Sequence, residues 1–131
     1  MAITWKEEFN TGEPEVDKQH KILFKYLEDL EAHMDAGDIN DQYVKTLLNN
    51  IGIFTRSHFC YEEICMRRVK CPVAAENKEY HAKLLDAYTR YCERFEIEGA
   101  SDSLIQKLHD FLESWLVNHI LKIDTHLRAC L

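Results

Sequence analysis

Histidine and carboxylate side chains recur at helical spacing within stripes of this sequence that are otherwise apolar. The set consists of His20, His58, Glu62, His81, His119 and Asp124. His58 and Glu62 are four residues apart, so they lie on one face of a helix. Uncompensated charges in a small core would cost several kcal/mol each, and a bound cation removes that cost. The pattern therefore predicts a metal site, and imidazole with carboxylate suits iron, zinc or manganese.

The other histidines fit this set less well. A single inward-facing histidine is more often a hydrogen-bonded core residue than a ligand, so the prediction rests on the set as a whole. Helical rotation displaces His33 from the face of His20, and His109 from the face of His119. We expect both on the surface. His126, seven residues past His119 and near the chain end, is a reserve candidate.

If His119 and Asp124 both bind the metal, their spacing requires a distortion of the last helix. Asp124 follows His119 by five residues, which turns a regular helix by about 500° and leaves the two side chains about 140° apart. A site that includes Asp124 therefore predicts a π-bulge or a break in the helix near residues 120–123.

Four amphipathic segments must position these residues. Apolar side chains recur at three- and four-residue steps over four ranges, which are about 15–36, 40–70, 74–97 and 102–128. Breaks at Gly37, Pro72 and Gly99 separate them. Four helices with short connections predict an all-α fold, an antiparallel up-and-down four-helix bundle. We expect one domain over residues 1–131.

The first 14 residues show no helical period. We expect them to form an extended N-terminal arm, with Trp5 and Phe9 packed across the ends of helices.

Composition excludes several classes of partner. The 131 residues are 46% hydrophobic and 30% charged, with a net charge of −7. This acidic balance argues against nucleic acid and anionic membranes as partners. No apolar run reaches the roughly 20 residues that span a bilayer, so we expect neither a membrane span nor membrane binding.

The five cysteines are odd in number and contain no CxxC pair, and no signal peptide precedes them. We therefore expect reduced thiols in a cytoplasmic protein, outside the metal site, with Cys65 and Cys92 in the core. A redox switch at Cys60, Cys71 or Cys130 is the less favoured alternative.

The pattern H…HxxxE…NxxxH…HxxxxD resembles that of the hemerythrin family, in particular its stand-alone bacterial members, the bacteriohemerythrins. The resemblance runs nearly from end to end. It is carried by ITWKEEFNTGEPEVDKQHKILF near the N-terminus, by SHFCYEEICM, and by WLVNHILKID near the C-terminus.

The resemblance implies a non-haem, carboxylate-bridged di-iron centre that binds O2 reversibly, for oxygen transport, storage or sensing, in a protein that is not an enzyme. His20 and His58 would ligate one iron, and His81 and His119 the other. Glu62 and Asp124 would bridge the two irons. An O2 pocket would be lined by Met66, Trp115 and Leu116. The implied partner is O2, with small anions at an open iron position, and the family leans towards a monomer.

One position departs from the family, whose third helix carries HxxxH. Here the first position is Asn77. It is expected to make a weak or water-mediated metal contact, or to leave the position vacant, while Glu76 is a less favoured substitute donor. Weaker metal retention and faster autoxidation would follow. The alternatives to O2 binding are therefore a di-iron oxidase, peroxidase or nitric-oxide-handling enzyme that uses the opened position, or an iron store or sensor.

Overall fold

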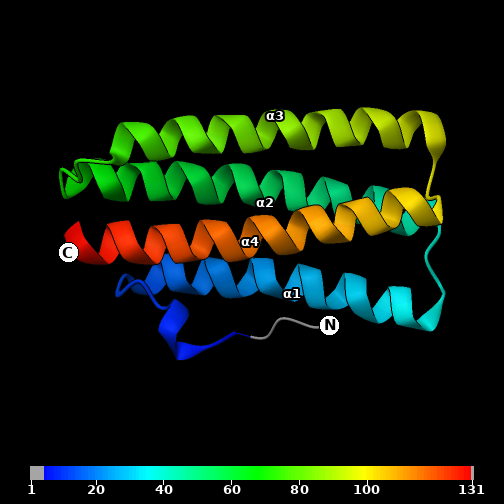
Figure 1. Ribbon diagram of the computed structural model, residues 1–131, viewed down its shortest axis with the longest axis horizontal. Helices are drawn as coiled ribbons and strands as arrows, with labels where there is room; N and C mark the ends of the chain where they lie inside the picture. The colour runs from blue at the N-terminus through cyan, green and yellow to red at the C-terminus, as the bar shows by residue number, and fades with distance from the viewer. Residues whose placement is uncertain (1–4, 131) are drawn as a thin grey trace.

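Four long helices make up most of the structure (Figure 1). The computed structural model describes residues 5–130, and the side chains of residues 121–126 and 129 lie outside the description. The helices are α1 (Pro14–Ala36), α2 (Asp41–Arg68), α3 (Ala74–Glu98) and α4 (Asp102–Cys130). Their ends differ from the predicted ranges by at most two residues.

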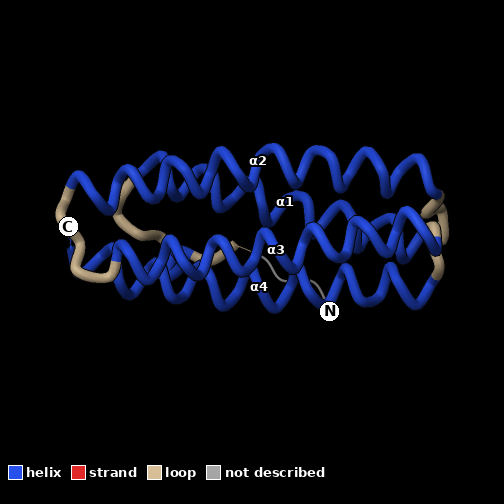
Figure 2. The backbone as a smooth tube through the Cα atoms, turned by 90° about the horizontal axis from the view of Figure 1, so that it is seen from above, coloured by secondary structure: helices blue, strands red, loops and turns tan. Residues whose placement is uncertain are grey.

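The helices form an antiparallel up-and-down bundle. Successive helices run in opposite directions, and the view from above shows two pairs of helices side by side (Figure 2). α1 contacts α2 and α4, and α3 contacts α2 and α4, so the ring of helices closes. No strand occurs among residues 5–130. The predicted all-α four-helix bundle is confirmed.

Local capping explains where the helices begin and end. The Asn40 side chain accepts a hydrogen bond from the Tyr43 amide (2.8 Å) and caps α2. Gly37 ends α1 in the left-handed conformation (φ 69°), as its position in the sequence indicated. The Asp41 carboxylate accepts from the Ala100 amide (2.8 Å), which ties the start of α2 to the α3–α4 connection. The first two features determine where α1 ends and α2 begins, and the Asp41–Ala100 contact links two segments at one end of the bundle that are distant in sequence.

The N-terminal arm differs from the prediction in two ways. It contains a short 3₁₀ helix, η1 (Glu7–Phe9), and so is not extended throughout. Trp5 and Phe9 pack on Phe24, with ring centroids 5.6 and 5.7 Å away, so they cover the middle of α1 and not the helix ends. The reason is that the arm folds back along α1 and α4, where Arg128 donates to the backbone oxygens of Glu8 and Asn10.

The predicted π-bulge or break in α4 is wrong, because the backbone is α-helical through residues 120–123. A regular helix puts Leu127 seven residues after Ile120 and on the same face, and both side chains are buried. Core packing therefore favours an undistorted helix. By the rotation argument this counts against Asp124 as a bridging ligand. Its side chain lies outside the described residues, so its role stays a prediction.

The expectation that all cysteines are reduced is also wrong. Cys71 and Cys130 form a disulfide, while Cys60, Cys65 and Cys92 are free. The two residues are 59 positions apart in sequence, but the antiparallel order brings the end of α4 beside the α2–α3 connection, with Cα atoms 5.5 Å apart. The disulfide removes the ground on which a cytoplasmic location was expected. Among the described residues, no helix is long and apolar enough to cross a membrane.

Candidate metal centre

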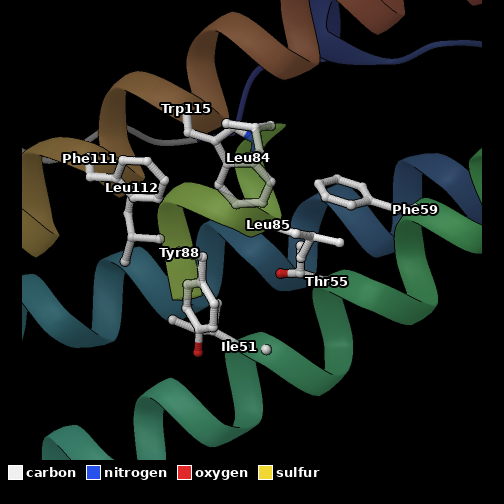
Figure 3. Close-up of a pocket in the computed structure, with 10 residues that line it drawn as sticks. Ile51, Thr55, Phe59, Leu84, Leu85, Tyr88, Phe111, Leu112 and Trp115 are labelled. Atoms are coloured by element: carbon white, nitrogen blue, oxygen red, sulfur yellow. The ribbon is translucent and has the colours of Figure 1, made fainter. Parts of the chain in front are cut away.

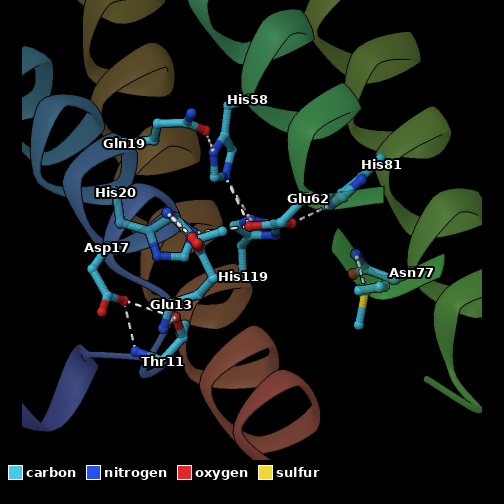
Figure 4. A network of polar contacts seen from close by, with 12 residues as sticks. Thr11, Glu13, Asp17, Gln19, His20, His58, Glu62, Asn77, His81 and His119 are labelled. Atoms are coloured by element: carbon cyan, nitrogen blue, oxygen red, sulfur yellow. Dashed lines mark hydrogen bonds and ion pairs between the residues drawn. The ribbon is translucent and has the colours of Figure 1, made fainter. Parts of the chain in front are cut away.

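Glu62 lies at the centre of a buried group of histidines (Figure 4). Its Oε2 atom is 3.0 Å from Nε2 of His20, 2.9 Å from Nε2 of His58 and 3.3 Å from Nε2 of His119. Its Oε1 atom is 3.0 Å from Nε2 of His81. All five side chains are at most 2% exposed. Each of the four helices therefore contributes one histidine to a single carboxylate.

Hydrogen bonds at the Nδ1 atoms of two of these histidines show that the Nε2 atoms facing Glu62 can carry lone pairs. Nδ1–H of His58 donates to Oε1 of Gln19 (2.8 Å), and Nδ1–H of His81 donates to Oε2 of Glu63 (3.0 Å). In a neutral imidazole the other nitrogen, Nε2, then carries a lone pair. Two acceptors within 3 Å of each other require a proton or a cation between them. The arrangement fits a metal ion held by Nε2 atoms and a carboxylate.

Several buried polar atoms of the group lack a hydrogen-bond partner, which also indicates a site for a metal ion. They are Nδ1 of His20, Nδ1 of His119, Oε1 of Glu62 and Nε2 of His81. The approach of Glu62 Oε1 to His81 Nε2 is short but is not aligned as a hydrogen bond. Buried polar groups without partners are rare in proteins. Ligation by a cation would satisfy the last two of these atoms.

The ionisation states suit metal binding. Burial by itself would raise the pKa of the Glu62 carboxyl, but the nearby imidazoles of His119, His58 and His20 hold that pKa well below its usual range. Burial lowers the pKa of His119 to about 4, and it also lowers that of His20. The site therefore presents an ionised carboxylate and, at His20 and His119, neutral imidazoles, which are the forms that bind metals.

Gln19 and Glu63 are functional candidates that sequence reasoning missed. A metal-binding histidine usually donates its second ring N–H to an oxygen, which fixes the ring's orientation. Both residues do this for the histidines they contact. The available signal was position, because Gln19 precedes His20 and Glu63 follows Glu62 in the chain.

Asn77 is buried within one helical turn of His81. The side chain is 1% exposed, and its Nδ2 donates to Sδ of Met66 (3.2 Å) while its Oδ1 is buried without a hydrogen-bond partner. Met66 thus orients the amide. The amide oxygen is left available to a ligand.

Aromatic rings cover the site on the side of α2, α3 and α4. The Phe59 ring stacks on His81 (centroids 3.8 Å apart), and the Trp115 ring lies against His119 (5.7 Å). Both rings also line a small apolar cavity with Thr55, Leu84 and Leu85 (Figure 3). Sequence reasoning did not single out Phe59, although it lies beside His58 in the SHFCYEEICM segment that carries the family resemblance.

The three residues predicted to line an O2 pocket are all buried, but they do not share one cluster. Trp115 and Leu116 belong to the main core. Met66 packs in a smaller cluster with Val16 and Cys65. The Trp115 ring lies against His119 of the site.

The histidines outside the site differ in their exposure and in their partners. His33 is partly exposed and pairs with Asp38 (2.7 Å). The prediction that His109 lies on the surface is wrong, since it is only 8% exposed and contacts Glu31. Ten residues rotate His109 about 80° from His119, and this flank of α4 packs on α1. The side chain of His126 lies outside the described residues.

Comparisons with known proteins decide the family. Residues 11–131 match the model of the hemerythrin HHE cation binding domain. The chain belongs to the hemerythrin family. Its match to the bacteriohemerythrin of Stenotrophomonas maltophilia (strain R551-3) is 27% identical over 118 residues, covering 90% of this chain and 74% of the relative.

Other relatives match over more of their length. The hemerythrin-like protein of Naegleria gruberi is 28% identical over 129 residues, covering 98% of this chain and 93% of the relative. The bacteriohemerythrin of Clostridium acetobutylicum (strain ATCC 824) is 26% identical over 127 residues, covering 93% and 95%. Membership of the hemerythrin family implies a non-haem iron site, and the buried histidines around Glu62 fit that metal.

Proposed function

We propose that this protein binds O2 reversibly at a non-haem di-iron centre, for carriage, storage or sensing. One observation carries the proposal: four buried imidazoles, one from each helix, surround a single carboxylate, and at His58 and His81 acceptor atoms face that carboxylate. His20 and His58 are assigned to one iron, His81 and His119 to the other, and Glu62 to the bridge. Asp124 is retained as the proposed second bridge on the family resemblance alone, since the regular course of α4 through residues 120–123 counts against it. Iron held there would supply the O2 chemistry.

The surrounding residues orient the ligands and exclude water. Gln19 and Glu63 hold the rings of His58 and His81 with Nε2 towards Glu62. Phe59 and Trp115 cover the histidines with apolar surface. Two carboxylates of the described residues reach the site, Glu62 and Glu63, and both contact its histidines. This arrangement favours binding over proton-coupled catalysis.

Asn77 is proposed to complete the His81 side of the centre weakly, through Oδ1 or a water held by it. The unpartnered, buried Oδ1 supports this assignment. An amide oxygen is a poorer ligand for iron than an imidazole. We therefore expect looser iron retention than with a histidine at this position.

The test is metal analysis together with the visible spectrum of the reduced, iron-loaded protein before O2, after O2, and after O2 is removed again. We expect two irons per chain and an absorption band that appears with O2 and disappears without it. His58→Ala should lose iron and the band, whereas His33→Ala, at a partly exposed histidine, should keep both. Preferential zinc binding, irreversible bleaching, or repeated turnover of peroxide or nitric oxide would contradict the proposal.

A further inference from the structure

A second cluster of metal-binding side chains lies between α1 and α4, away from Glu62. Nε2 of His109 is 2.8 Å from Oε2 of Glu31 and 3.7 Å from Oε2 of Glu113. One ligand atom from each residue lies within 4.8 Å of the others. His109 and Glu113 are four residues apart on α4, and Glu31 comes from α1. The cluster therefore spans two helices.

The imidazole of His109 is held with Nε2 towards the two glutamates. Its Nδ1 lies 3.1 Å from Oδ1 of Asp110, and a carboxylate accepts from the ring N–H. A carboxylate behind the imidazole is the usual arrangement of a metal-binding histidine. Nε2 lies 2.8 Å from Oε2 of Glu31, so a protonated ring donates Nε2–H to that carboxylate. In a neutral ring a cation can take the place of this proton.

The charges of the cluster do not balance. Three carboxylates, those of Glu31, Asp110 and Glu113, surround one imidazole, and no described lysine or arginine makes an ion pair with them. The Oε1 atom of Glu31 is buried and has no hydrogen-bond partner. The cluster attracts positive charge.

This cluster is separate from the centre around Glu62. His109 precedes His119 by ten residues on α4, and Glu31 follows His20 by eleven on α1. Because the two helices are antiparallel, both offsets run the same way along the bundle, by about 15 Å. The same pair of helices carries two groups of ligands about three turns apart.

We propose that Glu31, His109 and Glu113 bind a divalent transition-metal ion, with Asp110 as a positioning residue. One imidazole and two carboxylates suit Mn²⁺, Fe²⁺, Co²⁺ or Zn²⁺. Three protein ligands leave coordination positions for water, because Glu113 and Asp110 face solvent in part. The ion would join α1 to α4 at the end of the bundle away from the disulfide.

The test uses Co²⁺ as the probe, added without O2 to protein whose first centre has been saturated with iron. We expect one Co²⁺ per chain beyond the iron, with the visible absorption of ligated cobalt. Glu113→Gln, at a partly exposed residue, should weaken this binding by about 10-fold or more. Asp110→Asn should weaken it by about 10-fold through the ring of His109. The iron content of both variants should stay that of the wild type.

Glu93→Gln on α3 is the matched control and should leave Co²⁺ binding unchanged. A His58→Ala variant, which disables the first centre, should still bind one Co²⁺, so failure of the di-iron assignment would not affect this outcome. If the protein binds no Co²⁺ beyond the iron, or if Glu113→Gln binds Co²⁺ as tightly as the wild type, the three residues form an ion pair only. Thermal unfolding of each variant identifies any that fail to fold.

Discussion

Glu62 holds the candidate centre together with two oxygen atoms. Oε2 approaches three imidazoles and Oε1 approaches the fourth. Such a group is unfavourable without a proton or cation, because buried acceptors then face each other. The residues behind the histidines resist rotation away from this arrangement, so they should matter to metal retention although they touch no metal.

Glu63→Leu removes the acceptor for Nδ1–H of His81, whereas Glu63→Gln keeps an acceptor oxygen without the charge. We expect the leucine variant to release iron to a chelator about 10-fold faster or more, since an outer hydrogen bond orients the ligand. The glutamine variant should fall between it and the wild type. Chelator competition followed by absorbance measures this. Equal release from all three proteins would contradict the role assigned to Glu63.

Asn77→His places an imidazole four residues before His81, on the same buried face of α3. We expect slower autoxidation and slower iron loss, because an imidazole binds iron more strongly than an amide oxygen. Decay of the O2-dependent band under air measures the first, and chelator competition the second. The control is Asn118→His, on an exposed part of α4, which should change neither. Faster autoxidation in Asn77→His would refute our account of this position.

The helices contribute to the site through their alignment along the bundle. α2 supplies both His58 and Glu62, while α1, α3 and α4 each supply one histidine, so a sliding of any helix by one turn would remove a ligand. The Asp41–Ala100 contact opposes sliding at one end. At the other end, the Cys71–Cys130 disulfide joins α4 to the α2–α3 connection.

Cys130→Ser should lower the free energy of unfolding by about 2–4 kcal/mol, since the disulfide closes a long loop in the unfolded chain. Urea unfolding of metal-free protein, with and without a reductant, measures this. Reductant should destabilise the wild type and leave the variant unchanged. Cys60→Ser, at an exposed free cysteine, is the control and should have little effect. Five titratable thiols in the native wild type would contradict the pairing.

At the scale of the whole molecule, metal at the first centre would link all four helices. The main core, which includes Phe24 and Leu108, lies on one side of the histidines along the bundle. The smaller cluster around Met66 lies on the other side. The candidate centre therefore sits between two apolar clusters. A metal bound only by the folded chain stabilises it by mass action.

Loading the apoprotein with Fe²⁺ without O2 should raise the temperature of thermal unfolding. At free iron of 100 times the dissociation constant, the gain is about 2.7 kcal/mol for each iron bound, or about 10 °C per iron for a chain of this size. A chelator should reverse the shift. Calorimetry or circular dichroism measures it, and His58→Ala should show much less of it. An unchanged transition in the wild type would mean that the folded chain does not hold the metal.

Much of this protein follows from local pattern in the sequence. The apolar period and the breaks at Gly37, Pro72 and Gly99 predicted four helices in a bundle, because side-chain period and capping act within a few residues. The positions of His20, His58, Glu62, His81 and His119 on buried faces predicted that they would meet. Their convergence in the structure agrees with that expectation, and their role as ligands stays a proposal.

Other features depended on contacts between distant parts of the chain. The disulfide joins residues 59 positions apart, and His109 is buried because the flank of α4 packs on α1. The arm lies along α1 through Trp5 and Phe24, and α4 stays regular because Leu127 packs in the core. Spacing along the chain establishes which residues can share a helix face. Which faces meet is visible in the folded structure alone, because that depends on how the helices rotate and align against one another.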